Sequence, residues 1–349
     1  MGLPQIMINF KTAGRTAVRR SARGQAVLLL EGEESGSVCF LLPEQVEQAG
    51  LDRRAETLVK LCFLGNPARV WLGTYPAGGE QAALEAWEKN AEGGWLCAPD
   101  MQAEAVSAFV RAGRAAGKPL RAVVSTMGTP DCAGVVNLTT QGIRVLLDNE
   151  AEDIATADYC ARVAGLLAGL SLRQSATYHA LPEVTEFLPS ADPAGDIDNG
   201  RLILDRGSDG ARLARAVTSL VTTADSGEAA LKKIKIAEGI DLIRADIRSI
   251  FESEYVGKVL NDYDSKLLLV TAINGYFAGL TGSVLDTGRK NQAYVDYAAQ
   301  KAWLESRNVD TQRMTETEIL SANTGSQVFL KASVRFADAM EDLVFDITM

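Results

Sequence analysis

Histidine and cysteine are both scarce in this sequence, which limits the chemistry that it can support. The only histidine is His179, and no cysteine lies at metal-ligand spacing from it. The five cysteines form an odd set without a C-x-x-C pair, typical of reduced structural thiols in a protein folded in a cytoplasm (Cys39, Cys62, Cys97, Cys132 and Cys160). We therefore expect no metal site and no cofactor.

Long apolar runs and an excess of positive charge are also missing. No stretch approaches the roughly 18 to 20 apolar residues of a membrane-spanning helix, and the N-terminus lacks the pattern of a signal peptide. With 35 basic against 45 acidic residues, the net charge of -10 argues against a nucleic-acid surface. We expect no direct nucleic-acid contact and no membrane insertion, so the protein would leave its cell by lysis or within a particle.

The first two thirds of the chain alternate between strand and helix patterns. Short apolar runs predict strands, and the segments between them show helical spacing. This alternation predicts an α/β fold with a mainly parallel sheet and helices on its faces. The predicted strands are Ala26–Leu30, Val38–Leu42, Arg69–Leu72, Trp95–Ala98, Arg121–Val124, Val135–Leu138, Ile143–Leu147 and Arg201–Asp205, and the predicted helices are Arg53–Phe63, Glu80–Lys89, Gln102–Ala116 and Thr156–Leu170.

A smaller α+β region follows the first. A long helix carries isoleucines at steps of three and four from Ile236 to Ile250, with a charged opposite face that includes Lys235, Glu238 and Asp241. A second helix over Leu267–Leu280 and a strand-helix segment over Tyr294–Arg307 complete it. We expect an arm and linker over 1–24, a core domain over 25–231 and a C-terminal domain over 232–349.

Both ends of the chain alternate apolar and polar residues. Ile6, Ile8 and Phe10 share one side of Gln5–Lys11, and Leu343, Phe345, Ile347 and Met349 share one side of Asp342–Met349. A strand with one apolar face is a liability unless it is an interface, which favours extended arms (the second beginning near residue 328) that add to the sheet of a neighbouring subunit. The alternative is that both ends pair within their own chain.

Several segments along the chain carry a shared, ordered pattern. Near the start are Met1–Lys11, Ala17–Gly24 and Ala26–Leu30. Further on are Ala161–Leu170, Ser175–Thr177, Arg215–Leu220, Lys232–Ile236, Asp241–Ile247, Tyr255–Lys258, Asn274–Phe277 and Ala339–Leu343. Together these segments resemble contractile tail sheath proteins of myophages, defective prophage particles and R-type bacteriocins. The resemblance covers nearly the whole chain, but this chain is too short for the extra β-rich outer domain of larger relatives.

The resemblance implies a virion structural protein of a contractile injection system, not an enzyme. It implies a three-layer core that is subtilisin-like in fold, stacked hexameric rings around an inner tail tube, and terminal arms that link neighbouring subunits. Further partners would be the baseplate and tail-terminator proteins, with assembly in a bacterial cytoplasm. The main alternative is a non-contractile tube or shell protein that assembles from copies of itself.

A subtilisin-like fold also raises the alternative of a serine hydrolase, which needs Asp, His and a nucleophilic Ser. His179 is the only possible base, and no G-x-S-x-G motif surrounds Ser190, Ser208 or Ser219. Asp196–Gly200 resembles the start of a calcium loop, but Gly207 stands where the loop requires Glu. A polar turn explains this segment better, and no phosphate-binding loop is present.

Two further sets of residues are expected to serve assembly. Gly14 and Gly24 flank the N-terminal linker and are candidate hinges, with Gly325 as a weaker candidate. In the C-terminal region, Lys290, Lys301 and Arg307 are candidates for ion pairs with the tail tube, although a solvated charged face would look the same in sequence.

Overall fold

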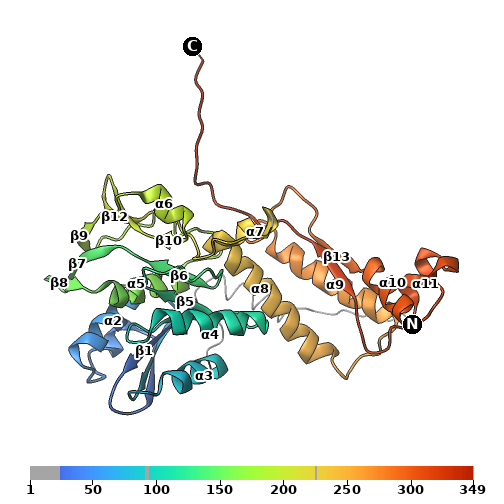
Figure 1. Ribbon diagram of the computed structural model, residues 1–349, viewed down its shortest axis with the longest axis horizontal. Coiled ribbons are helices and arrows are strands. Elements are labelled where there is room, and N and C mark those ends of the chain that lie inside the picture. The colour runs from blue at the N-terminus through green and yellow to red at the C-terminus, as the bar shows by residue number, and fades with distance from the viewer. Residues whose placement is uncertain (1–23, 91–93, 225, 349) are drawn as a thin grey trace, which may run out of the picture. The chain divides into compact units, whose positions relative to one another are not determined.

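The computed structural model describes residues 24–90, 94–224 and 226–348 (Figure 1). These residues form two compact units. The sheet unit contains residues 24–241 together with 339–348, and the helical unit contains residues 242–338. The chain passes from one unit to the other after Asp241, within helix α8 (Ile234–Ile250). The domain boundary expected after Leu231 remains a prediction from the sequence.

A seven-stranded sheet forms the centre of the sheet unit, in the order β10-β6-β5-β4-β1-β3-β2. Every neighbouring pair is parallel except β2 with β3, which is antiparallel. A mainly parallel sheet was expected, and it is confirmed. The strands are β1 (Gln25–Glu31), β2 (Gly36–Phe40), β3 (Arg69–Tyr75), β4 (Trp95–Cys97), β5 (Arg121–Val124), β6 (Val135–Leu138) and β10 (Arg201–Leu202).

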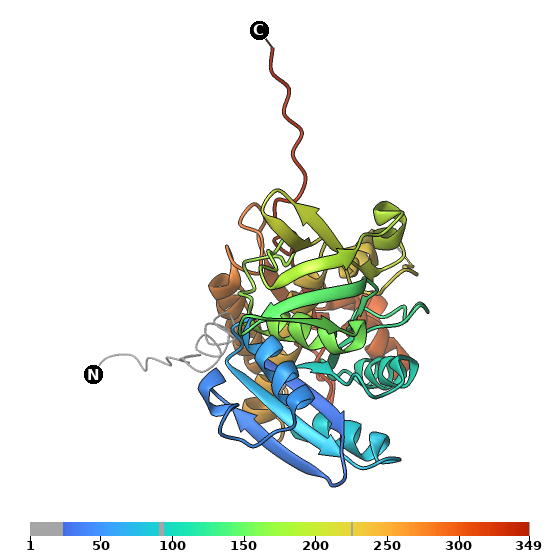
Figure 2. The same ribbon diagram turned by 90° about the vertical axis from the view of Figure 1, so that its left-hand side faces the viewer.

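Helices cover both faces of this sheet, as Figure 2 shows. The central strand β1 is apolar at successive positions because its side chains alternate between two cores. Ala26, Leu28 and Leu30 pack in one core with α2 (Arg53–Phe63) and α5 (Thr156–Gly169). Val27 and Leu29 pack in the other with α3 (Glu80–Asn90) and α4 (Ala103–Ala115). The unit is therefore a three-layer α/β sandwich.

Glycines allow the chain after α2 to pass directly against α5. A Cβ atom on Gly65 would lie 2.2 Å from backbone atoms of Gly165 and Leu166, and one on Gly165 would lie 2.1 Å from the carbonyl oxygen of Cys62. No side chain fits in either place. Cys62 and Cys160 are buried here, and the five cysteines are free thiols, four of them buried.

Smaller sheets complete the sheet unit. β7 (Gln141–Leu147) lies between β8 (Glu150–Ile154) and β9 (Val184–Leu188), and both pairs are antiparallel. The expected strand Arg201–Asp205 divides into β10 and β11 (Leu204–Gly207), which pairs with β12 (Gly210–Leu213). The polar turn expected at Asp196 is part of the short helix α6 (Pro193–Asp198), capped by the Asp192 side chain.

The charged face predicted for helix α8 holds its acidic side chains in ion pairs. The carboxylate of Asp241 pairs with Arg114 at 2.6 Å, and that of Glu238 pairs with Arg121 at 2.7 Å and accepts a bond from Trp95 at 2.9 Å. These acidic side chains are only 4% and 14% exposed, and Lys235 is buried as well. The acids face basic partners of the sheet unit, so this side of α8 is an internal contact.

The helical unit is built on α9 (Tyr263–Leu280), which buries Leu269, Ile273 and Phe277. The Tyr276 hydroxyl donates to Asp246 on the last turns of α8 at 2.8 Å. The other elements are α10 (Tyr297–Ser306), α11 (Glu316–Ser321) and the antiparallel pair β13 (Gln292–Val295) and β14 (Leu330–Ser333). Across the described residues, no helix has the length and apolarity needed to cross a membrane.

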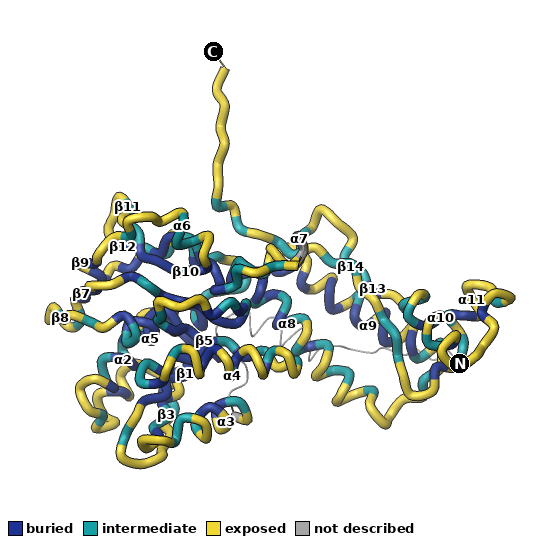
Figure 3. The backbone as a smooth tube through the Cα atoms, viewed as in Figure 1, coloured by how far each residue is buried: buried dark blue, intermediate teal, exposed yellow. Residues whose placement is uncertain are grey.

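The strand expected at Asp342–Met349 is not formed. Residues 337–348 carry no regular secondary structure, and Figure 3 shows the last of them as exposed. A strand needs backbone partners, and no described strand pairs with this segment in the single chain. Residues 342–348 therefore pair with no described strand of their own chain, whereas β14 (Leu330–Ser333), which lies inside the arm predicted from about residue 328, pairs with β13 (Gln292–Val295) of the same chain.

Candidate assembly surfaces

Large apolar side chains lie in the open over the last ten described residues. Leu343, Val344, Phe345 and Ile347 are between 73% and 89% exposed, and Met340 is fully exposed. Side chains of this kind are normally buried, and an exposed run of them usually marks an interface. We call residues 343–349 the C-terminal arm; the first three residues predicted on its apolar side, Leu343, Phe345 and Ile347, all lie in the open.

Two acidic residues fasten the base of the arm to the sheet unit. The Glu341 carboxylate accepts hydrogen bonds from Ser175 at 2.9 Å and Thr177 at 2.7 Å, and lies 3.2 Å from the Lys233 ammonium. Its side chain is 5% exposed. Asp342 forms an ion pair with Arg215 at the surface. The arm thus begins at a fixed point, and its apolar side chains at 343, 344, 345 and 347 are exposed.

Sequence reasoning did not identify this anchor. Ser175–Thr177 and Ala339–Leu343 both resemble tail sheath segments, but they are separated by more than 160 residues. The available signal in the sequence was that both segments resemble the same protein family. The fold is needed to show that they are in contact. The loop holding Ser175 and Thr177 follows α5, whose buried face fixes its position.

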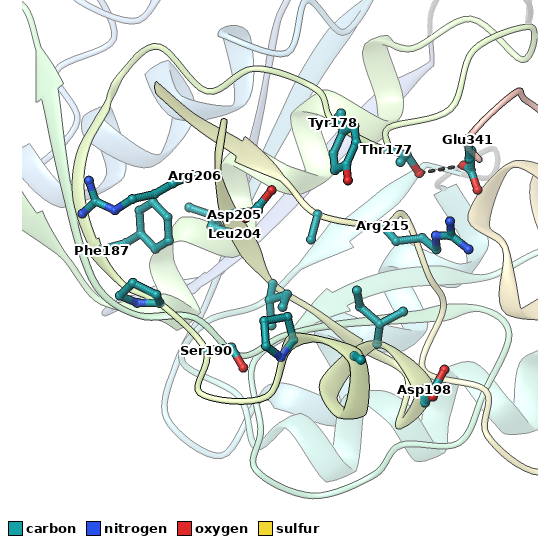
Figure 4. A pocket seen from close by; sticks show the side chains of 16 residues that line it. Thr177, Tyr178, Phe187, Ser190, Asp198, Leu204, Asp205, Arg206, Arg215 and Glu341 are labelled. Carbon is teal, nitrogen blue, oxygen red and sulfur yellow. Dashed lines mark hydrogen bonds between the residues drawn. The ribbon is translucent and has the colours of Figure 1, made fainter. Parts of the chain in front are cut away.

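A pocket opens beside the anchor, within the sheet unit (Figure 4). It has a volume of about 510 Å³, and Glu341, Thr177 and Arg215 form one end of its lining. Phe187 and Arg206 line the opposite end, where the guanidinium lies 5.1 Å above the aromatic ring. The intervening wall is mostly apolar, with Pro189, Pro193, Ile197, Ile203 and Leu204.

The N-terminal candidates fall mostly outside the described residues. Ile6, Ile8, Phe10 and Gly14 belong to residues 1–23. Gly24 is described, and its backbone is bonded on both sides: its N–H donates to Ala168 at 2.5 Å and its carbonyl accepts from Ala68 at 2.7 Å. These bonds fit an anchor for β1 better than a hinge.

The candidate tube contacts lie in the helical unit. Lys301 and Arg307 belong to α10 and its C-terminal cap, while Lys290 precedes β13 and is exposed. The Arg307 guanidinium lies 5.3 Å above the Trp303 ring, and Lys301 is 3.9 Å from Glu305. The helix therefore brings Lys301 and Arg307 onto one element, and the structure gives no contact between them and Lys290.

The candidate nucleophiles do not form a triad with His179. Ser190 donates to Asp196, and Ser219 is fully buried and donates to Cys132 at 3.0 Å. Burial, followed by the nearby Arg162 guanidinium, lowers the pKa of His179 below its usual value. Asp196 also pairs with Arg201 at 3.1 Å, so the segment resembling a calcium loop uses its acid internally. Within the described residues, no cluster of three acidic, cysteine or histidine side chains could hold a metal.

The comparisons with known proteins agree on one family. Residues 226–349 match the phage tail sheath C-terminal domain. The whole chain is 30% identical to the tail sheath protein of Clostridium phage phiCD119 over 363 residues, covering 100% of this chain and 99% of the relative.

Solved sheath structures share the fold at lower identity. The anti-feeding prophage helical sheath in its contracted state matches with a TM-score of 0.71 at 14% identity, over 100% of this chain and 99% of the other. The sheath tail protein from Listeria innocua matches with a TM-score of 0.66 at 14% identity, over 94% and 99%. The relatives are structural proteins and not enzymes, and this chain belongs to the phage tail sheath protein family.

Proposed function

We propose that this protein polymerises with copies of itself as stacked hexameric rings around an inner tail tube, and that the sheath contracts to drive the tube through a target cell envelope. The observation that carries the proposal is the C-terminal arm: an exposed apolar segment that starts from a buried anchor. A sheet edge of another copy would supply the backbone and apolar contacts that this segment lacks in the single chain. One solved structure whose fold matches over the whole chain is itself a helical sheath in a contracted state.

The arm is proposed to act by adding a strand to the sheet of a neighbouring subunit. Its alternation gives one face with Leu343, Phe345 and Ile347, which suits a half-buried strand. A suitable acceptor is the pair β13 and β14, because a two-stranded sheet has two open edges and is marginally stable by itself. The N-terminal residues Ile6, Ile8 and Phe10 are proposed to act in the same way.

One arm contributes little by itself, which makes assembly depend on several contacts together. About five backbone hydrogen bonds are worth about 1 kcal/mol each, and three apolar side chains about 2 kcal/mol each. Ordering about eight residues costs about 1 to 2 kcal/mol per residue. These contributions nearly cancel, so we expect a template, such as a tube on a baseplate, to start the polymer.

The finer parts of the proposal follow from the same family membership. The three-layer sandwich supports a subtilisin-like core without its chemistry, since the candidate serines are bonded elsewhere. Tail tube, baseplate and tail-terminator proteins are the proposed partners, with assembly in a bacterial cytoplasm and release by lysis as part of a phage tail or tail-like particle. The proposed hinge lies before Gly24, with Gly14 as its candidate.

Electron microscopy of the purified protein at rising concentration tests the central proposal. Three proteins are compared: the full chain, a chain that ends at Asp342 and so keeps the Glu341 anchor, and a chain that lacks residues 1–20. We expect wide hollow tubes from the full chain only. Tubes from the protein ending at Asp342 would show that the C-terminal arm is not the link. Tubes that have one diameter under every condition would favour a non-contractile tube or shell protein.

A further inference from the structure

The C-terminal arm and the pocket meet at one residue. Glu341 both anchors the arm and lines the pocket, and all the lining residues belong to the sheet unit. We propose that the pocket stores the chain's own C-terminal arm before assembly, with Phe345 inserted between α6 and the β11–β12 hairpin, and releases it when a neighbouring subunit offers a sheet edge. The occupant is thus a segment of the same molecule, and the contact is a latch.

The anchor lies at the pocket itself, so the arm begins beside its proposed site. Asp342 pairs with Arg215, which lines the same end of the pocket as Glu341. From Asp342 to Phe345 is three residues, so the Phe345 backbone reaches about 10 Å from the anchor when extended. Figure 4 shows Glu341 and Arg215 at one end of the pocket and Phe187 at the other, with the apolar wall between them.

The chemistry of the pocket matches that of the arm. Proline, isoleucine and leucine side chains form its wall, and the arm offers Leu343, Phe345 and Ile347. At the far end, the Arg206 guanidinium stacks on Phe187, where an incoming acid such as Asp346 could pair with it. The lining also has three acids: Asp205 pairs with Arg212 at 2.7 Å, Glu341 lies beside Lys233, and Asp198 is exposed at the rim.

The exposure of the arm is the reason to propose that it is stored in the pocket. This inference rests on the proposed function, because covering the arm benefits only a subunit that later uses it to bind a neighbour. Four large apolar side chains in the open would promote indiscriminate association. An internal contact forms at a high effective concentration, so a weak pocket suffices to cover them. Release to a neighbour then requires a better site, which only the growing polymer provides.

Cross-linking tests the latch in the full chain below the concentration at which it polymerises. Cys39→Ser removes the only cysteine that is not buried. Val344→Cys and Asp198→Cys then place thiols on the arm and on the pocket rim, and a short bis-maleimide joins them. The matched control replaces Asp198→Cys by Leu41→Cys, which is also exposed but follows β2 at the opposite edge of the sheet from β10.

Two readouts decide the outcome. We expect the pocket pair to give at least about fivefold more internal cross-link than the control, because the arm is held at the pocket. In a mixture of nitrogen-15 and unlabelled protein, the linked peptides should be of uniform isotope. A yield equal to the control overturns the proposal, as do linked peptides of mixed isotope, which would place the arm of a second copy in the pocket.

A pocket-filling variant provides an independent check. Ala194 is an exposed residue of α6 that lines the pocket, so Ala194→Trp should fill it without disturbing the fold, and the pocket cross-link should fall to the control level. An unchanged yield in the filled variant would contradict the latch. These readouts do not depend on polymerisation: a latch without tubes would leave the sheath proposal wrong, and tubes without a latch would leave only the latch wrong.

Discussion

At the scale of the residue, one buried ion pair stabilises the sheet unit. The Arg162 guanidinium lies 2.7 Å from the Glu183 carboxylate, which also accepts a hydrogen bond from Tyr159 at 2.7 Å. The two charged side chains are 2% and 5% exposed. Because a charge buried without its partner is costly, Glu183→Ala should destabilise the protein by about 3 to 5 kcal/mol in urea unfolding.

The matched control for this change is Glu150→Ala, at an ion pair that is open to water. Arg53 and Glu150 are 3.2 Å apart, and both side chains are 75% exposed. Its loss should cost less than about 1 kcal/mol. Equal losses of stability in the two variants would show that Arg162 finds another partner or solvent.

The single histidine makes one pH dependence easy to isolate. The pKa of His179 is lowered in the folded protein, first by burial and then by Arg162. The unfolded chain therefore takes up a proton below its usual pKa of about 6.5 while the folded protein does not, so stability is lost as the pH falls through that value. His179→Gln should lose less stability than the natural chain between pH 7.5 and 5.5, as measured by urea midpoints. A parallel loss in both proteins would contradict this.

At the scale of the element, the arm should have two faces with different importance. If it adds to a neighbouring sheet, Phe345 and Ile347 are buried together while Val344 faces the other way. Phe345→Ser combined with Ile347→Ser should raise the concentration needed for tube formation by at least about tenfold, since burying one such side chain is worth about 2 kcal/mol. The measurement is sedimentation of polymer at a series of protein concentrations.

Val344→Ser is the matched control, because it also removes an exposed apolar side chain of the arm. Its polymer should form within about twofold of the natural concentration. If all three apolar positions prove equally important, the arm binds by a mode other than a strand with one buried face.

Elements with a strong periodic pattern could be predicted from the sequence, and exposed ones could not. The bounds of α2, β5 and β6 match their predictions because their apolar residues are buried at regular steps. β8 escaped notice because its sequence, Glu150–Ile154, is acidic and largely exposed. The C-terminal arm has the pattern of a strand but pairs with no strand of its own chain. The sequence therefore predicts which of its side chains share one side, but not whether the strand forms in a single subunit.

Long-range contacts were the other limit. The sequence shows that one face of α8 is charged but not what it contacts, because its partners, Arg114 and Arg121, lie more than 100 residues away. The arm anchor at Glu341 was missed for the same reason. Both are sites where charge pairing brings distant segments together, which a local pattern cannot reveal.

At the scale of the whole molecule, function depends on surfaces that a single subunit leaves unused. Arm contacts that are nearly neutral in free energy favour free subunits until several neighbours are held together, and contacts that do not close on themselves then extend as a helical filament. The latch proposed for the pocket would also favour free subunits, since binding of the arm in the pocket competes with its first contact with a neighbouring subunit. Control of assembly thus follows from weak single contacts.

The attachment of such a sheath to its tube provides the last prediction. Lys301 and Arg307 lie on or next to α10. Arg307 stacks on Trp303, and Lys301 has a long ion pair, 3.9 Å from Glu305, that an acidic surface would have to replace. Reversing both charges, Lys301→Glu with Arg307→Glu, should weaken co-sedimentation with purified tail tubes at low salt by at least about tenfold and remove its salt dependence. Arg313→Glu is the control, as another cation of the helical unit with a side chain that is 91% exposed. Unchanged attachment of the double variant would place the tube contact elsewhere, whereas an equal loss with Arg313→Glu would mean that net charge, and not this helix, determines binding.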